Sequence, residues 1–266
     1  MKAGRRSSLS LVLALVCVLG LGARCGDEEK PKAAASTTST TPGLTGKLMV
    51  LAAASLSESF RELGTAFEAK HPGTKVSFSF DSSSGLAAQA NNGAPADLFA
   101  SADQTNMKKV TAAGNATGPR VFAHNKLAII VAKGNPKKIT GLADLDKSSV
   151  SFVLCAPEVP CGRYGAEALT KAGVKAKPKS LETNVKGVVT KVAGGEVDAG
   201  IGYVTDAKAA SSAEGVEISD QHNVVAEYPM AVLEQSANSN LAYAFLDFIL
   251  GPEAQGVLAK YGFAAA

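Results

Sequence analysis

The chain has 266 residues, of which 46% are hydrophobic and 19% charged, an ordinary globular composition with enough apolar material for a core. Tryptophan is absent and aromatic residues make up only 6%, which disfavours a site that stacks sugars or encloses a large apolar ligand. Four basic residues and no acidic one lie in the first 24 positions. The formal charge therefore falls from +3 to −1 without them, and no basic surface for nucleic acid is indicated.

Residues 1–24 have the pattern of a secretory signal peptide. Lys2, Arg5 and Arg6 precede the apolar run LVLALVCVLGLGA, which is too short for a comfortable bilayer span. An N-terminal membrane anchor is the alternative, but no stop-transfer pattern follows the run. Both readings place the rest of the chain outside the cytoplasm.

Cys25 follows Gly22, Ala23 and Arg24, and this stretch resembles a bacterial lipobox, which predicts lipidation of Cys25. Cleavage nearby without a lipid is the alternative, since arginine is unusual just before the cysteine. The segment 25–46 is small, polar and proline-containing, and has no apolar period. It is predicted to be a flexible linker that tethers the body of the chain to the membrane.

Short apolar runs alternate with segments of helical period from Lys47 onward, which is typical of an α/β fold. Strands are expected at 48–53, 76–80, 97–101, 127–132, 150–154, 199–204 and 224–233. Helices are expected at 56–70, 84–92, 103–113, 162–173, 184–194, 237–250 and 252–260.

Two cysteines, Cys155 and Cys161, lie in the body of the chain. They are six positions apart in an exported protein, which predicts a disulfide. Zinc binding is the competing interpretation. It is disfavoured because His71, His124 and His222 are dispersed, whereas structural zinc requires clustered ligands.

Three predicted strand-to-helix junctions carry small hydroxyl or glycine-rich sequences: Ala54-Ser55-Leu56, the segment 81–85 (DSSSG), and the loop 155–164. An isolated serine at such a junction usually caps a helix. Several junctions together would gather hydroxyl and backbone donors without a formal charge. Such a set suits a fully deprotonated oxyanion.

Long motifs extend these junctions. The chain contains AAASL, then SSS-x-L, then GAPADLF-x-SAD, and later APEVPCGRYGAEAL, NVKGVVTKVAGGEVDAGIGYVTDA, AEYPMAV and FLDFILGPEAQGVLAKYGF. This series closely resembles the periplasmic molybdate-binding proteins over nearly all of residues 47–264. The resemblance implies a type II periplasmic-binding-protein fold with two lobes, each a mixed, mostly parallel sheet flanked by helices, and a ligand in the cleft. Lobe 1 is expected at 47–124 and 230–266, and lobe 2 at 125–229.

Five ligand-binding residues follow from the resemblance: Ser55, Ser83, Cys161, Val185 and Tyr203. Ser55 and Ser83 would donate hydroxyl and backbone N–H groups from lobe 1. Cys161 and Val185 would donate backbone N–H groups from lobe 2, and Tyr203 its phenolic hydroxyl. Cys161 stands where the family commonly has alanine, a change that keeps a backbone donor and lets a bridge stiffen the loop.

Two charged residues lie beside this predicted site. Asp81 stands where the family favours a small residue, and a carboxylate in the cleft would repel a dianion or accept the proton of hydrogen phosphate. We expect Asp81 to point away. Arg163 is interpreted as a helix-surface residue. The alternative is a site for an organic carboxylate, which would use this arginine as a fork.

The resemblance implies capture of molybdate, and of tungstate, for an ABC importer, with sulfate as the alternative ion. The expected partners are the oxyanion, the permease and ATPase of the importer, and the membrane through the lipid anchor. A monomer is expected, with no cofactor and no direct metal ligand. Catalysis is the alternative class, but Ser83 lacks a G-x-S-x-G elbow and the histidines have no triad-like setting.

Overall fold

The computed structural model describes residues 44–266. The predicted signal peptide, Cys25 and most of the predicted linker lie outside the described residues. Gly46, which the sequence placed at the end of the linker, is the first residue of strand β1 (Gly46–Ala53). Within 44–266, every helix is too short or too polar to cross a bilayer.

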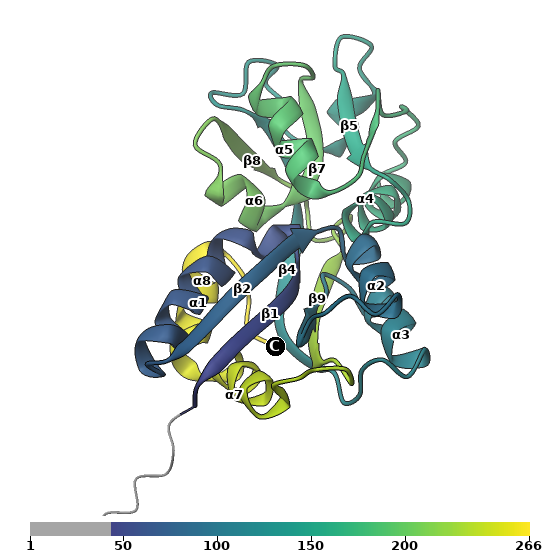
Figure 1. The fold of residues 1–266 in the computed structure, drawn as a ribbon. Helices are drawn as coiled ribbons and strands as arrows, with labels where there is room; N and C mark the ends of the chain where they lie inside the picture. The colour runs from purple at the N-terminus through teal and green to yellow at the C-terminus, as the bar shows by residue number, and fades with distance from the viewer. Residues whose placement is uncertain (1–43) are drawn as a thin grey trace, which may run out of the picture. The chain divides into compact units, whose positions relative to one another are not determined.

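The described body consists of two lobes connected by two long strands, β4 (Arg120–Ala132) and β9 (Val225–Val232) (Figure 1). The first lobe contains β1, β2 (Thr74–Asp81), β3 (Leu98–Ala100), α1 (Ser57–Lys70), α2 (Ser83–Asn91), α3 (Gln104–Ala112), α7 (Ser239–Leu250) and α8 (Pro252–Tyr261). The second lobe contains η2 (Leu142–Asp146), β5 (Phe152–Cys155), α4 (Pro160–Lys171), β6 (Leu181–Glu182), α5 (Val185–Ala193), β7 (Ala199–Tyr203), α6 (Val204–Ala209) and β8 (Ala213–Glu217).

Strands β4 and β9 belong to both lobes. Residues 120–126 of β4 pair with β9, whereas residues 127–132 pair with β7 and β8. The last residues of β9 pair with β3 in the first lobe. The expected lobe boundaries, after residues 124 and 229, therefore fall inside these two strands, and we propose that the lobes hinge there.

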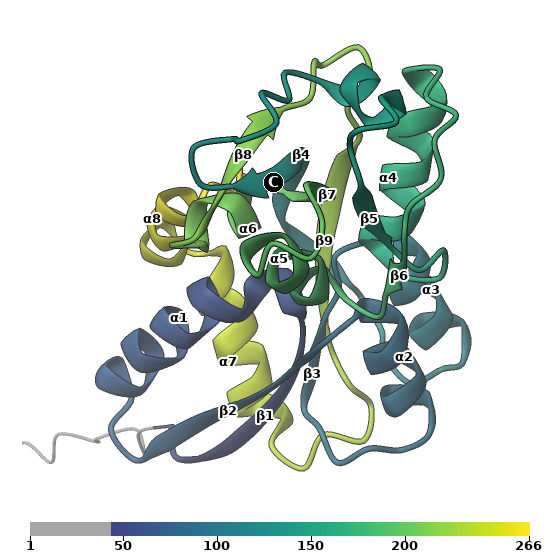
Figure 2. The same cartoon turned by 90° about the horizontal axis from the view of Figure 1, so that it is seen from above.

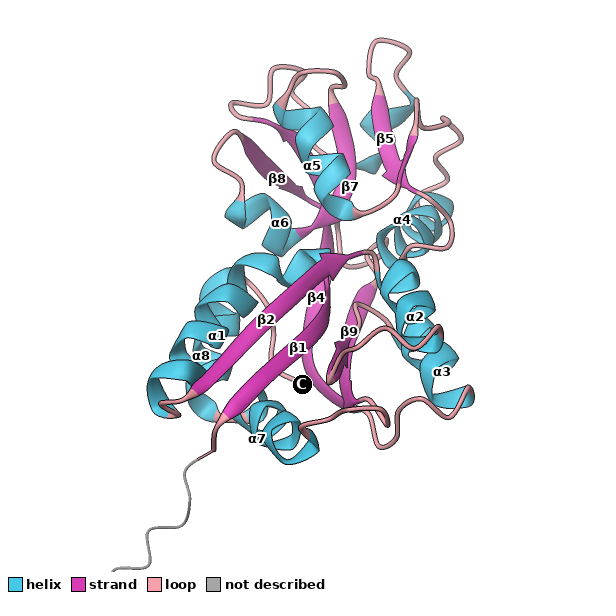
Figure 3. Ribbon diagram, in the orientation of Figure 1, coloured by secondary structure: helices cyan, strands magenta, loops and turns pink. Residues whose placement is uncertain are grey.

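Hydrogen bonds connect the strands in the order β2-β1-β3-β9-β4-β7-β5-β6, with β8 paired to β4. The pairs β1–β2, β1–β3, β5–β6 and β5–β7 are parallel, and the pairs that involve β4 or β9 are antiparallel. The sheet is therefore mixed, and in Figure 3 helices flank its strands in both lobes. Parallel strands direct their carboxyl ends, and the helix starts that follow, to one edge of the sheet.

Helices cover both faces of the first lobe's sheet (Figure 2). Successive residues of β1 point to opposite faces, so Val50 joins the core that contains Phe60 of α1 and Phe245 of α7. Leu51 joins a second core with Leu86 of α2, and with Met107 and Val110 of α3. This burial on both faces explains why the sequence of β1 is almost continuously apolar.

The expected helices begin and end within two residues of the observed ones. Several elements were not predicted: the first half of β4, the short helices η1 (Ala54–Leu56) and η2, the six-residue helix α6, the two-residue strand β6, and β8. The first half of β4 contains His124, Asn125 and Lys126, which interrupt its apolar run. The others are short or polar, so periodicity carries little signal for them.

Candidate functional site

A small cavity lies between the two lobes, where several helices begin. Its lining residues are Ala53, Ala54, Ser55, Ser83, Ala102, Val159, Pro160, Cys161, Val185 and Tyr203. All five residues predicted from the sequence are among them. Ser55 lies in the single turn η1 (Ala54–Leu56) after β1, and Ser83 is the first residue of α2. Cys161 lies in the first turn of α4, Val185 begins α5, and Tyr203 ends β7.

The volume of this cavity is about 10 Å³, far below the roughly 300–1,000 Å³ of pockets for drug-sized ligands. Of the described residues that line it, none carries a formal charge. The space therefore suits a small, compact ligand that neutral donors recognise.

The helix starts supply backbone donors. The first N–H groups of a helix have no acceptor within that helix and lie at the positive end of its dipole. Within residues 44–266, the N–H groups of Ser83, Cys161 and Val185 donate no hydrogen bond to protein atoms. Three such starts around one cavity form an anion-binding arrangement.

Neighbouring residues cap two of these helices, which leaves the predicted donors free. Ser82 caps α2 by accepting from the N–H of Gly85, and Asn184 caps α5 by accepting from the N–H groups of Lys186 and Gly187. The capping role that an isolated serine usually has thus belongs to Ser82. Ser83 is instead buried and directed at the cavity.

Three hydroxyl groups complete the set of donors. The Oγ of Ser83 accepts a hydrogen bond from the N–H of Ala102 (2.9 Å), and the Oγ of Ser55 lies 2.9 Å from the Oη of Tyr228. The Oη of Tyr203 is buried and finds no hydrogen-bond partner within the described residues. Burial raises the pKa of the Tyr203 phenol well above its ordinary value of 10.0, so this group keeps its proton.

A disulfide connects Cys155, at the end of β5, to Cys161 in the first turn of α4, as the sequence predicted. The chain between them turns tightly: a Cβ atom on Gly162 would lie 2.0 Å from the carbonyl oxygen of Ala156. The bridge and this close approach hold the start of α4, and so the N–H of Cys161, against the sheet.

Charged and polar pairs cross the cleft beside the cavity. Arg163 of α4 forms an ion pair with Asp103 at the start of α3, and the Nζ of Lys186 lies 2.8 Å from Glu58 of α1. The interpretation of Arg163 as a helix-surface residue is wrong, because its guanidinium reaches a carboxylate with a fully buried side chain in the other lobe.

Asp81 does not line the cavity. Its Oδ1 accepts hydrogen bonds from the N–H of Ser82 (2.7 Å) and from the Nδ2 of Asn184 (3.2 Å) across the cleft. The Asp81 carboxylate, which would repel a dianion in the cleft, therefore points to other partners, as we expected.

Sequence reasoning missed the groups that lie behind the predicted donors. Tyr228 contacts Ser55, Asn125 contacts Tyr228, and Lys186 joins Glu58. Tyr228 lies in the AEYPMAV motif, but the motif alone assigns it no role. Asn125 lies in the half of β4 that was not predicted, so no local signal pointed to it.

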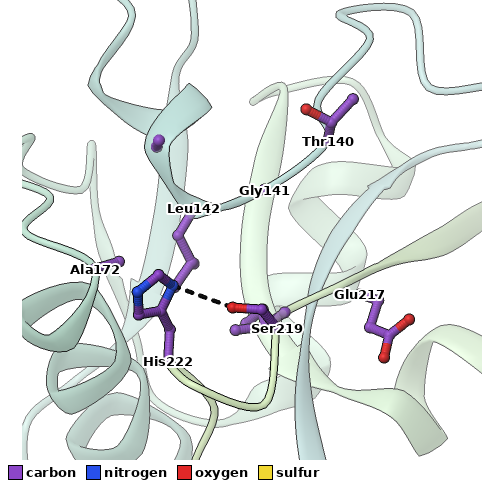
Figure 4. Close-up of a pocket in the computed structure, with 9 residues that line it drawn as sticks. Thr140, Gly141, Leu142, Ala172, Glu217, Ser219 and His222 are labelled. Carbon is purple, nitrogen blue, oxygen red and sulfur yellow. Dashed lines mark hydrogen bonds between the residues drawn. The ribbon is translucent and has the colours of Figure 1, made fainter.

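A larger cavity of about 590 Å³ lies elsewhere in the second lobe (Figure 4). There the Nδ1 of His222 lies 3.2 Å from the Oγ of Ser219, and Figure 4 shows Glu217 directed away from the imidazole. Ser219 is exposed, and the backbone N–H of His222 bonds to its carbonyl in an ordinary turn. Its lining includes the start of the short helix η2 but none of the predicted donors.

The family model described as bacterial extracellular solute-binding protein matches residues 48–264. This chain belongs to the bacterial extracellular solute-binding proteins. Among curated members, the molybdate-binding protein ModA of Mycobacterium tuberculosis is 39% identical over 97% of this chain and 97% of its own length.

Solved structures of solute-binding proteins share the fold. The substrate-binding domain of a putative molybdenum ABC transporter from Clostridium difficile has a TM-score of 0.64 at 27% identity, and covers 83% of this chain and 99% of its own. The sulfate-binding protein SubI of Mycobacterium tuberculosis has a TM-score of 0.75 at 21% identity, over 83% and 87% of the two chains. The last likeness shows the fold alone. The chain has the two-lobed type II periplasmic-binding-protein fold.

Proposed function

We propose that this solute-binding protein captures molybdate, and equally tungstate, as an intact tetrahedral oxyanion and delivers it to an ABC importer. The observation that carries the proposal is the convergence of three helix starts and the partnerless Tyr203 hydroxyl on one small uncharged cavity. The relative at 39% identity, a molybdate-binding protein by name, supports the same ion.

The proposed ligand contacts come from both lobes. Ser55 and Ser83 donate from the first lobe through their hydroxyls, and Ser83 also through its N–H. Cys161 and Val185 donate backbone N–H groups from the second lobe, and Tyr203 donates its phenolic proton. Because neither lobe alone offers the full set, the ion stabilises the form in which the lobes meet, and the importer would recognise that form.

A site that contains only hydrogen-bond donors selects among oxyanions by their protonation state. Molybdate, tungstate and sulfate are dianions at neutral pH, whereas hydrogen phosphate carries a proton that would face other donors. Sulfate is the second candidate, because SubI, a protein of the same fold, is named a sulfate-binding protein. Its smaller size distinguishes it from the metal oxyanions, so cavity dimensions decide between them.

A binding role also agrees with the placement of the histidines. A Ser83 nucleophile requires a base within hydrogen-bonding reach. His71 packs at a tilt against Phe67, the Nδ1 of His124 lies 2.8 Å from the carbonyl of Ala265, and His222 pairs with Ser219. We therefore propose that the protein is not an enzyme and that it needs no cofactor.

The proposed setting is the outer face of the cell membrane. The family is extracellular by description, and the sequence predicts a signal peptide with a lipid anchor at Cys25. A monomer attached by that anchor would exchange its ion with a permease and its ATPase.

The Ser83→Ala variant tests the site, with Ser84→Ala as its matched control. Ser84 is the neighbouring serine, its hydroxyl donates to Ser82, and it does not line the cavity. Calorimetric titration with molybdate should show about a tenfold or greater loss of affinity for Ser83→Ala, because a hydrogen bond to a charged group contributes about 1.5–3 kcal/mol. Ser84→Ala should bind like the wild type, and equal losses in both variants would refute the site.

A further inference from the structure

Tyr228 lies at the hinge between the lobes, behind the proposed ligand donors. It is in β9, its side chain is fully buried, and its Oη lies 2.9 Å from the Oγ of Ser55. Its ring meets that of Tyr203 edge-on, with centroids 6.1 Å apart. Tyr228 thus contacts one proposed donor from each lobe without lining the cavity itself.

The direction of the Tyr228–Ser55 hydrogen bond follows from Asn125. The Oδ1 of Asn125 accepts from the backbone N–H of Lys126 (3.0 Å), and a backbone N–H is always a donor. This contact identifies the amide oxygen, so the other amide atom is the NH₂ group. That group donates to the Oγ1 of Thr205 (2.9 Å) and to the Oη of Tyr228 (3.3 Å).

Tyr228 therefore accepts from Asn125 and donates its own proton to Ser55. Burial raises the pKa of the Tyr228 phenol above its ordinary value, so the proton stays on the oxygen. The Ser55 oxygen then accepts a hydrogen bond from Tyr228, on the side away from the cavity. Its own hydroxyl proton is left to donate into the cavity. Ser83 is polarised in the same way, because its oxygen accepts from the N–H of Ala102.

We propose that Tyr228 is a positioning residue that determines specificity: it holds the Ser55 hydroxyl as a donor toward the ligand. The inference rests on the proposed function, since it concerns the same oxyanion site. Without the Tyr228 hydroxyl, no donor among residues 44–266 bonds to the Ser55 oxygen, which is then free to turn toward the ligand. The site then loses part of its preference for an ion that offers only acceptors over one that carries a proton.

The test is a double-mutant cycle on the full-length protein, with Tyr228→Phe and Ser55→Ala alone and together, titrated with molybdate and with phosphate at neutral pH. Tyr228→Phe keeps the ring and removes one oxygen. It should raise the dissociation constant for molybdate about tenfold and reduce the ratio of molybdate to phosphate affinity. In the Ser55→Ala background the same change should alter the molybdate affinity less than about twofold.

Tyr261→Phe is the matched control, because the Tyr261 hydroxyl bonds to Glu62 (2.8 Å) away from the cavity. It should leave both affinities unchanged. Asn125→Ala supplies a second route if Tyr228→Phe folds poorly: it removes the donor that sets the direction, and it should weaken molybdate binding several-fold in the same sense.

Undiminished molybdate binding by Tyr228→Phe would overturn the inference, and so would an equal loss in both Ser55 backgrounds, which marks a structural role. A wild-type protein that binds sulfate instead of molybdate would refute the proposed ion. The same cycle run with sulfate would then decide the role of Tyr228. If the wild-type protein binds none of the tested oxyanions, both the inference and the proposed function are overturned.

Discussion

Arg163 of α4 reaches across the cleft to Asp103, the residue that caps α3 in the other lobe. The carboxylate also accepts from the N–H (2.7 Å) and the Nδ2 (3.0 Å) of Asn106, so it has partners in its own lobe. The arginine contact exists only while the lobes meet. The pair therefore contributes to the contact between the lobes, and neither residue lines the cavity.

Arg163→Ala should weaken molybdate binding moderately, by about 1 kcal/mol or roughly fivefold in the dissociation constant, since the arginine is one-third exposed. The loss should appear as faster release in stopped-flow measurements. Arg120→Ala is the control, because it breaks an ion pair with Asp247 within one lobe (2.7 Å). Complete loss of binding in Arg163→Ala would show direct ligand contact and contradict this interpretation.

Tyr203→Phe should separate binding from stability. The Tyr203 hydroxyl is buried without a protein partner in the described residues, a state that costs about 1–3 kcal/mol. Its removal should raise the free energy of unfolding without ligand by about 1 kcal/mol and weaken molybdate binding at least tenfold.

Urea unfolding without ligand and calorimetric titration measure the two effects of this change. Tyr261→Phe removes a bonded hydroxyl outside the site, so it should lower stability slightly and leave binding intact. A Tyr203→Phe variant that is clearly less stable than the wild type, or that binds equally well, would contradict the role given to this hydroxyl.

The sequence predicted the main helices and five of the ten residues that line the cavity, because these depend on long motifs and on strand-to-helix junctions. It could not predict what the cleft brings together. Arg163 and Asp103 are 60 positions apart, and Ser55 and Tyr228 are 173 apart, so no local pattern relates them. The assignment of Ser82, and not Ser83, as the N-cap of α2 likewise required the backbone geometry.

The fold shows the same division. The apolar second half of β4 was recognised, but its first half was not, because Asn125 and His124 interrupt the pattern. Those polar residues are satisfied by contacts distant in sequence: Asn125 bonds to Thr205 and His124 to Ala265. This half of β4 is therefore a strand because of its tertiary contacts, and the periodicity of its sequence does not show it.

Molybdate affinity should stay constant between pH 7 and pH 10. Burial raises the pKa values of Tyr203 and Tyr228 above 10.0, so both phenols remain protonated, and backbone N–H groups do not titrate. Burial lowers the pKa of Lys186, but the carboxylates of Asp206 and Glu58 raise it further, so this cross-cleft cation also persists. Calorimetric titrations across this range check the prediction, and a decline centred near pH 9 would contradict it.

Stability should fall as the pH rises above 10. A phenol whose pKa is higher in the folded state than in the unfolded state stabilises the fold below its unfolded pKa, and this stabilisation is lost at higher pH. Burial raises the pKa of Tyr164 to about 12, so much of the loss should lie between pH 10 and pH 12. Urea midpoints at pH 9 to 11 measure it. A midpoint that rises over this range would contradict the assignment.

Replacing both Cys155 and Cys161 with alanine should lower the free energy of unfolding by about 2 kcal/mol, the amount expected when a loop this short is opened. The change keeps the backbone N–H at position 161. Molybdate affinity should therefore fall by less than about tenfold. Thermal unfolding and titration of the double variant check both parts, and unchanged stability together with lost binding would contradict the account.

A site made of donors alone should select a large tetrahedral dianion. Calorimetric titration of the wild-type protein with molybdate, tungstate, sulfate and phosphate at neutral pH measures this selectivity. Molybdate and tungstate should bind tightly, and sulfate and phosphate much more weakly. Preferential binding of sulfate or phosphate would contradict the ion assignment, and no binding of any of the four would contradict the oxyanion site itself.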